Sequence, residues 1–299
     1  MKYAKVRILM ASVALLGLVA CDKAGQPSSQ TAAGSASGEG SAEKKLNTYV
    51  EAHNKFIDTF GFVEMAEAYR KTDVAHASVD GTFNVSAGWI GQGLEKLKEA
   101  RASAGGPADL DTAADALITS MGKVQTRLAS LETYYSSKKY LDDKLARGKA
   151  EDRQMLAELD AAEKDFERFG AQLDLSLDKR DQALLETLKG SDPLKYNAKL
   201  ALMHAKKLMN LFNGPDDLNR PDIFAKGDAE VAIIEKAIAD AHDEAVKKGK
   251  SDPSGLSSLT SMLGSYRTLK QRHEASDAQS MLRQYNQAVD SSNTWSSVE

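Results

Sequence analysis

The chain has 299 residues, of which 42% are hydrophobic and 27% are charged, and this balance is typical of a globular protein with a buried core. Its 39 basic and 43 acidic residues give a net charge of −4, which argues against nucleic acid as a partner because surfaces that bind nucleic acid are basic. Aromatic residues make up only 6% of the chain and prolines number six, a composition that favours helices.

The first 20 residues are predicted to form a signal peptide. Lys2, Lys5 and Arg7 give a positively charged start, and residues 8–20 form an apolar run of 13 residues. A helix that spans a membrane needs roughly 20 apolar residues, so this run is too short to cross one. It matches the apolar region of a signal peptide instead, and we expect residues 1–20 to be removed.

Cys21 is the only cysteine in the chain and directly follows this apolar run. The sequence Leu18-Val19-Ala20-Cys21 resembles a lipobox, and we predict that Cys21 becomes a lipidated N-terminus whose acyl chains hold the protein to a membrane. The alternative is an ordinary signal peptide with an incidental cysteine. Asp22 resembles a retention signal and favours the inner membrane over the outer membrane.

Residues 21–43 are almost all small or polar and cannot bury much apolar surface, so we predict a flexible, lipidated linker. A helical domain is predicted over residues 44–295, where apolar residues recur at helical spacing. We expect a first helix of about 25 residues from Leu46, a loop over residues 72–93 and a last long helix after Pro253.

The strongest periodic pattern is a pair of heptad series that predicts a seam for a partner helix. The two series are Leu110, Leu117, Val124 and Leu131, and Ala114, Met121, Leu128 and Tyr135. No segment alternates convincingly with the period of a strand. The fold class is therefore predicted to be all-α, an elongated bundle of about six to eight helices, several of them long and antiparallel.

Two pairs of asparagines share a spacing of seven residues at opposite ends of the predicted domain. Asn47 and Asn54 lie in the first predicted helix, and Asn286 and Asn293 lie in the last. Residues seven apart occupy nearly the same helix face. We interpret the four side chains as a candidate polar layer that fixes helix pairing, as buried asparagine does in coiled coils. Chance and a role in ligand binding remain open alternatives.

Tyrosine, lysine and aspartate side chains gather after the predicted seam. They form a candidate ligand or partner site made of Tyr134, Tyr135, Lys138, Tyr140, Asp142 and Asp143. Lys138 and Asp142 fall where the seam should be apolar. Either the helix ends or rotates here, so that Tyr134, Leu141 and Leu145 continue the seam and the charges face water, or Tyr135, Tyr140 and Asp142 line a polar pocket.

The order of these short motifs resembles the YiiG-like family of bacterial lipoproteins. The likeness rests on Tyr134-Tyr135, on Lys138-Lys139-Tyr140-Leu141-Asp142-Asp143, on Gly148-Lys149 and on the segments Leu46-Asn47-Thr48-Tyr49 and Tyr285-Asn286. It covers residues 44–293, and Leu46-Asn47 departs from the family's Tyr-Asn. That family has no established function, so the resemblance implies a lipobox, a helical body and an envelope location without an activity.

The usual sequence signatures of catalysis are missing. The five histidines are scattered, and no spacing of His and Cys suits a metal. No Gly-x-Ser-x-Gly motif occurs, so we predict no catalytic residue, metal or cofactor. We expect a lipid-anchored cell-envelope protein that faces the periplasm, a non-enzymatic binding or structural module for an envelope protein or polymer. The alternative is a periplasmic binder of a small ligand or cation at the Tyr/Asp site.

Overall fold

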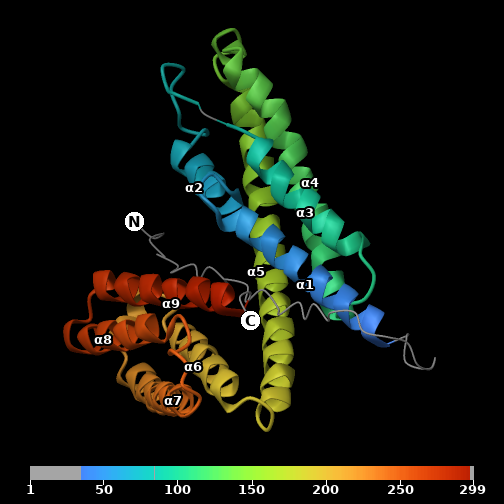
Figure 1. Cartoon of the computed structure of the whole chain (residues 1–299). Coiled ribbons are helices and arrows are strands. Elements are labelled where there is room, and N and C mark those ends of the chain that lie inside the picture. The colour runs from blue at the N-terminus through green and yellow to red at the C-terminus, as the bar shows by residue number, and fades with distance from the viewer. Residues whose placement is uncertain (1–34, 84, 297–299) are drawn as a thin grey trace. The chain divides into compact units, whose positions relative to one another are not determined.

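The computed structural model describes residues 35–83 and 85–296, and these residues form helices joined by turns and loops (Figure 1). The described residues contain no strand, and the predicted all-α fold is confirmed. None of their helices is both long enough and apolar enough to cross a membrane. The predicted signal peptide, Cys21 and the first part of the predicted linker lie outside the described residues.

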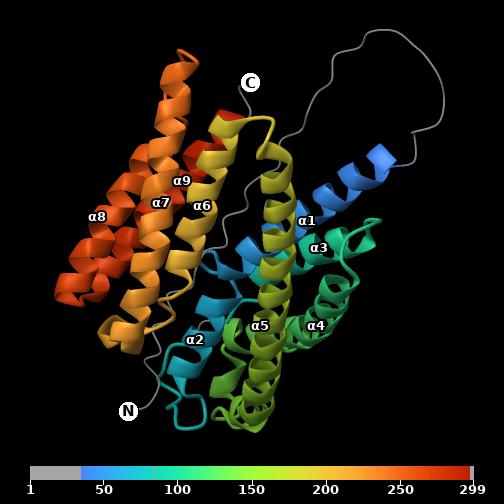
Figure 2. The ribbon, with the colours of Figure 1, turned by 90° about the horizontal axis from the view of Figure 1, so that it is seen from below.

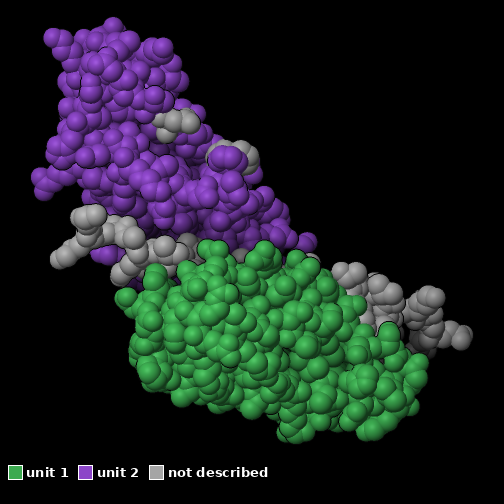
Figure 3. Space-filling view, turned by 90° about the vertical axis from the view of Figure 1, so that its left-hand side faces the viewer, with its two compact units in different colours: residues 1–24, 178–299 green, residues 25–177 purple. Residues whose placement is uncertain are grey.

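The helices belong to two compact units, which Figure 3 shows in different colours. In the described part of the chain, unit 2 comprises the residues up to 177 and unit 1 comprises the residues from 178 onward. The chain passes from unit 2 to unit 1 within one continuous helix, α5 (Ala146–Leu188). The sequence pattern over residues 44–295 showed no such division, because the boundary carries the pattern of an amphipathic helix and not that of a linker.

Unit 2 is built from four helices and the first part of α5. The four are α1 (Ser35–Ile57), α2 (Phe62–Thr72), α3 (Gly88–Ala102) and α4 (Ala108–Ser136). The last part of the predicted linker, from residue 35, is thus helical. α1 packs along α3, and α3 packs against α4 (Figure 1). All eight residues of the predicted seam are buried on α4. Aromatic rings join α1 to α5, with the Tyr49 and Phe169 centroids 5.6 Å apart.

Unit 1 contains the end of α5 and four further helices. These are α6 (Pro193–Met209), α7 (Pro221–Lys247), α8 (Leu256–Arg272) and α9 (Ala275–Ser296), with the short 3-10 helix η2 (Pro215–Asn219) before α7. α6 packs along α7, and α8 packs along α9 (Figure 2). Asp192 starts α6, because its side chain accepts a hydrogen bond from the Lys195 amide at 3.4 Å. The helices enclose one apolar core of their own.

Two helices that the sequence pattern presented as continuous are each broken by a turn. α1 and α2 are separated at Phe60, whose φ is 71°, and α8 and α9 are separated at His273, whose φ is 56°. A Cβ atom on Gly61 would lie 2.5 Å from the carbonyl oxygen of Phe56, so only glycine fits where the chain folds back. Apolar residues occur on both sides of each break, and the sequence analysis therefore did not reveal the turns.

The loop predicted over residues 72–93 is shorter than expected, because α3 begins at Gly88 and includes Gly91 and Gly93. A Cβ atom on Gly93 would lie only 2.6 Å from Cε1 of Phe56. Gly93 therefore serves close packing between α1 and α3. The sequence analysis placed Gly93 in a loop, because glycine more often interrupts a helix.

Candidate functional site

The connection between α4 and α5 contains the residues that the sequence singled out. It includes the short 3-10 helix η1 (Lys139–Leu141). Lys138, Lys144 and Leu145 have positive φ angles of 55°, 54° and 65°, a conformation that non-glycine residues adopt mainly in tight turns. The chain thus reverses direction in a compact corner, which we call the α4–α5 corner (residues 134–148).

The six predicted site residues do not form one site at this corner, because two of them point to water. Lys138 and Asp142 are exposed, and neither side chain has a hydrogen bond or ion pair within the described part of the chain. Tyr134 and Leu145 are buried, as the interpretation of a helix end expected, whereas Leu141 is 52% exposed. The two charges therefore face water and do not line a pocket with the tyrosines.

The three predicted tyrosines lie together with Phe83, which comes from the segment between α2 and α3. The Phe83 ring stacks on Tyr135 at a centroid distance of 5.0 Å and an angle of 15°, and it meets the Tyr140 ring at 5.1 Å. Tyr134 contacts Tyr135 edge-on at 5.0 Å. Each such pair contributes roughly 0.5–1.5 kcal/mol beyond its buried area, so the cluster stabilises the corner.

Tyr134 and Asp143 bind the first turn of α5. The Tyr134 hydroxyl donates to the Asp143 carboxylate at 2.7 Å and accepts from the Gly148 amide at 3.4 Å. The other Asp143 oxygen accepts from the Arg147 amide at 3.1 Å. The bond from Tyr134 holds the pKa of Asp143 below its ordinary range, and burial followed by this bond raises the pKa of Tyr134 to about 12. These two residues thus act as a helix cap.

Tyr135 and Asp152 are the polar groups of the cluster that this cap does not use. The Tyr135 hydroxyl is buried and has no hydrogen-bond partner among the described residues. Asp152 is also buried, and its carboxylate accepts one hydrogen bond, from the Tyr69 hydroxyl at 3.0 Å. The sequence analysis missed Phe83, Tyr69 and Asp152. A usable signal was the position of Asp152, an acid that follows Gly148 by one helical turn and so shares its helix face.

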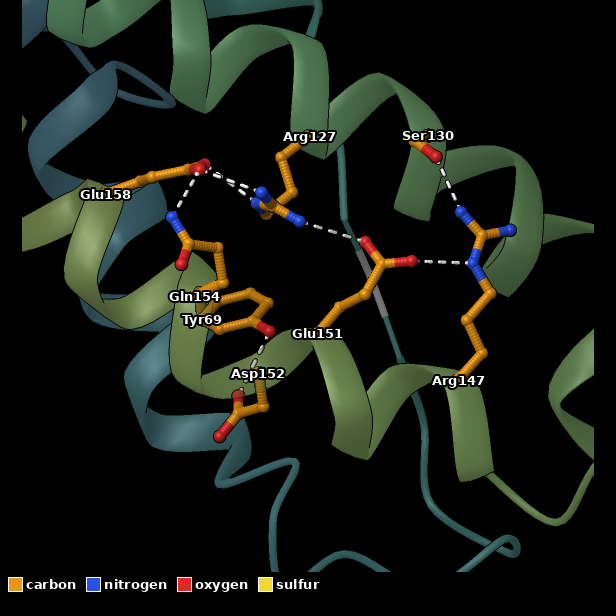
Figure 4. Close-up of polar contacts among 8 residues, drawn as sticks. All are labelled: Tyr69, Arg127, Ser130, Arg147, Glu151, Asp152, Gln154 and Glu158. Atoms are coloured by element: carbon orange, nitrogen blue, oxygen red, sulfur yellow. Dashed lines mark hydrogen bonds and ion pairs between the residues drawn. The ribbon is translucent and has the colours of Figure 1, made fainter.

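A ladder of ion pairs joins α4 to α5 next to the corner (Figure 4). Arg127 donates two hydrogen bonds to Glu158 at 2.7 and 2.8 Å and one to Glu151 at 3.2 Å. Arg147 donates to the other Glu151 oxygen at 2.8 Å and to Ser130 at 2.6 Å. The bonds from Arg127 hold the pKa of Glu158 below its usual value. Every charge in the ladder is paired, so it fixes the two helices and leaves no group free for a ligand.

A shallow groove of ≈ 470 Å³ lies beside this ladder, between α4 and α5 of unit 2. Its lining consists mostly of small side chains with a few charges: Ala116, Thr119, Ser120, Lys123, Gln154, Ala157, Glu158, Ala161 and Asp165. Within the described residues, Lys123 and Asp165 make no hydrogen bond or ion pair. The groove therefore offers one unpaired charge of each sign.

The asparagines of the predicted polar layer are divided between the units. Asn47 and Asn54 lie on α1 in unit 2, Asn286 lies on α9 in unit 1, and the Asn293 side chain is outside the described residues. The Oδ1 atoms of Asn54 and Asn286 are buried without a hydrogen-bond partner in the part of the chain described here. The pairing of the two asparagine sets stays a prediction.

Comparison with known proteins assigns a family but no activity. No curated protein and no solved structure matches this chain. Among the described residues, no group of three His, Cys, Asp or Glu side chains is placed to hold a metal ion. A family model does match residues 41–294, which are most of the chain and include both sets of helices. The chain belongs to the family described as protein of unknown function (DUF3829).

Proposed function

We propose that this protein is a lipid-anchored component of the cell envelope, with a non-enzymatic helical body that binds another envelope component. The observation that carries the proposal is the position of the only cysteine, Cys21, directly after the apolar residues 8–20. A lone cysteine cannot form an internal disulfide, and at this position its thiol is suited to acylation. Several acyl chains on one residue bind a membrane firmly, and Asp22 favours the inner membrane.

The anchor is tested by intact-mass measurement on protein extracted from membranes, with the wild type beside Cys21→Ser. The wild type should lack residues 1–20 and carry added lipid mass, and the variant should carry no lipid. An unmodified Cys21 in a wild-type protein that needs no detergent for extraction would refute the anchor.

We assign binding of the envelope component to the groove between α4 and α5, with an extended segment of a protein as its occupant. Ala116, Ala157 and Ala161 leave room between the helices, and Lys123 and Asp165 offer unpaired charges of opposite sign. The eight residues from Ala116 to Lys123 span about 10 Å along the helix, which is the length of about three extended residues. A short segment with an acidic and a basic side chain complements this groove.

Binding in the groove is tested by photo-crosslinking in intact cells. A photoreactive residue at Thr119 or Ala161 should give an adduct of one discrete mass, and a matched one at Ala232, exposed on α7, should not. Ala161→Arg, which fills the groove, should abolish the adduct formed from Thr119. Equal adducts at all three positions, or none in the groove, would exclude the groove as the binding surface.

A further inference from the structure

Asp152 differs from the other buried charged residues of the described chain because it has no partner of opposite charge. These residues are Lys45, Asp152 and Asp181, whose exposed fractions are 2%, 6% and 4%. Lys45 binds Asp111 at 2.7 Å, and Asp181 binds Lys199 at 3.1 Å. Asp152 has only the neutral Tyr69 hydroxyl at 3.0 Å. Buried charges are almost always paired, so the Asp152 carboxylate lacks a cation.

The Tyr135 hydroxyl, a buried oxygen without a hydrogen-bond partner among the described residues, lies against the same face of α5 as Asp152. A Cβ atom on Gly148 would be 2.6 Å from the Tyr135 hydroxyl oxygen, which places this oxygen against the turn that precedes Asp152. Residues four apart on a helix share a face, and side chains lean toward the helix N-terminus. The Asp152 carboxylate therefore leans toward the turn that Tyr135 touches. Burial and then nearby negative charge, including that of Asp152, raise the pKa of Tyr135.

We propose that Asp152, Tyr135 and Tyr69 form a binding site for the primary ammonium group of a ligand. An ammonium group has three N–H donors, and these three side chains offer three oxygen acceptors. The charge of the ligand compensates the carboxylate, and the Tyr135 hydroxyl gains the partner that it lacks. This site is independent of the acyl anchor and of the groove, so its failure would leave the proposed function standing.

The surroundings favour an ammonium group over a metal ion. Calcium takes six to eight oxygen ligands and usually several carboxylates, whereas this site has one carboxylate, and no cluster of three metal-ligating side chains occurs in the described residues. The rings of Tyr135 and Tyr140 lie next to each other in the adjoining cluster. Aromatic faces attract organic cations and accommodate the carbon chain that carries the ammonium group.

Phe83 marks the side from which a ligand enters. It is half-buried and stacks on the face of Tyr135. It belongs to the segment between α2 and α3, where the described residues 82, 83 and 85–87 have no regular secondary structure. A ligand chain takes the place of the Phe83 ring against Tyr135. Phe83→Ala should therefore raise the affinity for an amine, and a fall in affinity would exclude this route.

The site is tested with n-butylammonium chloride and the full chain purified in detergent. At constant ionic strength, n-butylammonium should raise the thermal midpoint in a saturable manner, and isothermal titration calorimetry should give one binding site. Tetramethylammonium, which has the same charge but no N–H donor, is the matched control and should neither raise the thermal midpoint nor bind in the calorimeter. Nα-acetyl-lysine amide and 1,5-diaminopentane then compare an amine on a peptide with a free amine.

Tyr135→Phe is the decisive variant, because its hydroxyl has no partner within the described structure and its loss removes no internal hydrogen bond. It should fold normally and bind n-butylammonium roughly tenfold more weakly. Asp152→Asn should abolish binding, whereas Asp142→Asn, at an exposed carboxylate in the same corner, should bind as the wild type does. Unchanged affinity in Tyr135→Phe, or equal shifts with tetramethylammonium, would overturn the proposal.

Discussion

The buried pair of Lys45 on α1 and Asp111 on α4 gives a prediction that depends on which partner is removed. Their charged groups are 2.7 Å apart, and the Tyr49 hydroxyl donates to the other Asp111 oxygen at 2.6 Å. The Lys45 side chain is only 2% exposed, whereas that of Asp111 is 19% exposed and has Arg101 within 3.7 Å. Lys45 has no second anion within the described residues, but Asp111 has both water and Arg101.

This difference fixes the expected magnitudes. Asp111→Ala leaves the Lys45 ammonium buried without a partner and should lower the free energy of unfolding by about 3–5 kcal/mol. Lys45→Met keeps the apolar stem and leaves Asp111 to water, Tyr49 and Arg101, so it should cost about 1 kcal/mol or less. Adding Lys45→Met to Asp111→Ala should recover roughly 2 kcal/mol or more, because the unpaired charge disappears.

Urea unfolding gives the free energies, and hydrogen exchange of backbone amides locates the change. Peptides from α1 and α4 should lose protection in Asp111→Ala, whereas peptides from α7 in unit 1 serve as the internal reference. Equal losses for Asp111→Ala and Lys45→Met would refute the reasoning, because it depends on the unequal burial of the two side chains. A double variant as unstable as Asp111→Ala would refute it as well.

Two further predictions concern α1. Gly93→Ala places a methyl group against Phe56 and should lower the free energy of unfolding by about 1–3 kcal/mol. Gly122→Ala, with nothing within 4 Å, should instead raise it by roughly 0.5–1 kcal/mol. Thermal unfolding compares the two variants, and a Gly93→Ala protein more stable than Gly122→Ala would contradict the close packing. Burial lowers the pKa of His53 below its ordinary 6.5, opposed by the charge of Asp174. The unfolded chain therefore takes up the proton first, and the free energy of unfolding should fall as the pH drops below 6.5 and level off below the folded pKa. His53→Gln should lack this decline in urea titrations, and an identical pH profile would exclude His53 as its cause.

The helical pattern in the sequence predicted the elements whose stability depends on burial of one face. The seam of α4 is an example, because Leu117, Val124 and Leu128 repeat at the period that a buried helix face requires. The pattern failed where the backbone obeys a local constraint instead. The turns at Phe60 and His273 depend on single residues with a positive φ, and Gly93 looks like a breaker until its contact with α1 is known.

The sequence predicted only those residues of the candidate site that are close together in the chain. Tyr134, Tyr135 and Tyr140 are close in sequence and lie together in space, so their proximity could be inferred from one short segment. Phe83 and Tyr69 reach the cluster from the segment after α2 and from α2 itself, and tertiary packing alone brings them there. Asp142 was predicted as a site residue because it stands among the tyrosines in the sequence, although it is exposed in the structure. Asp152, further along the chain, was missed.

Three of the residues on which the resemblance rests, Tyr134, Asp143 and Gly148, stabilise the α4–α5 corner. Tyr134 and Asp143 cap α5, and Gly148 leaves the space that the Tyr135 hydroxyl occupies. The contacts within the corner thus account for these residue types in this order, whatever the protein binds. Differences in binding between proteins with the same corner should therefore arise at positions that the cap does not use. Asp152 is such a position, because it takes no part in the cap and its carboxylate is bound only by the Tyr69 hydroxyl within the described residues.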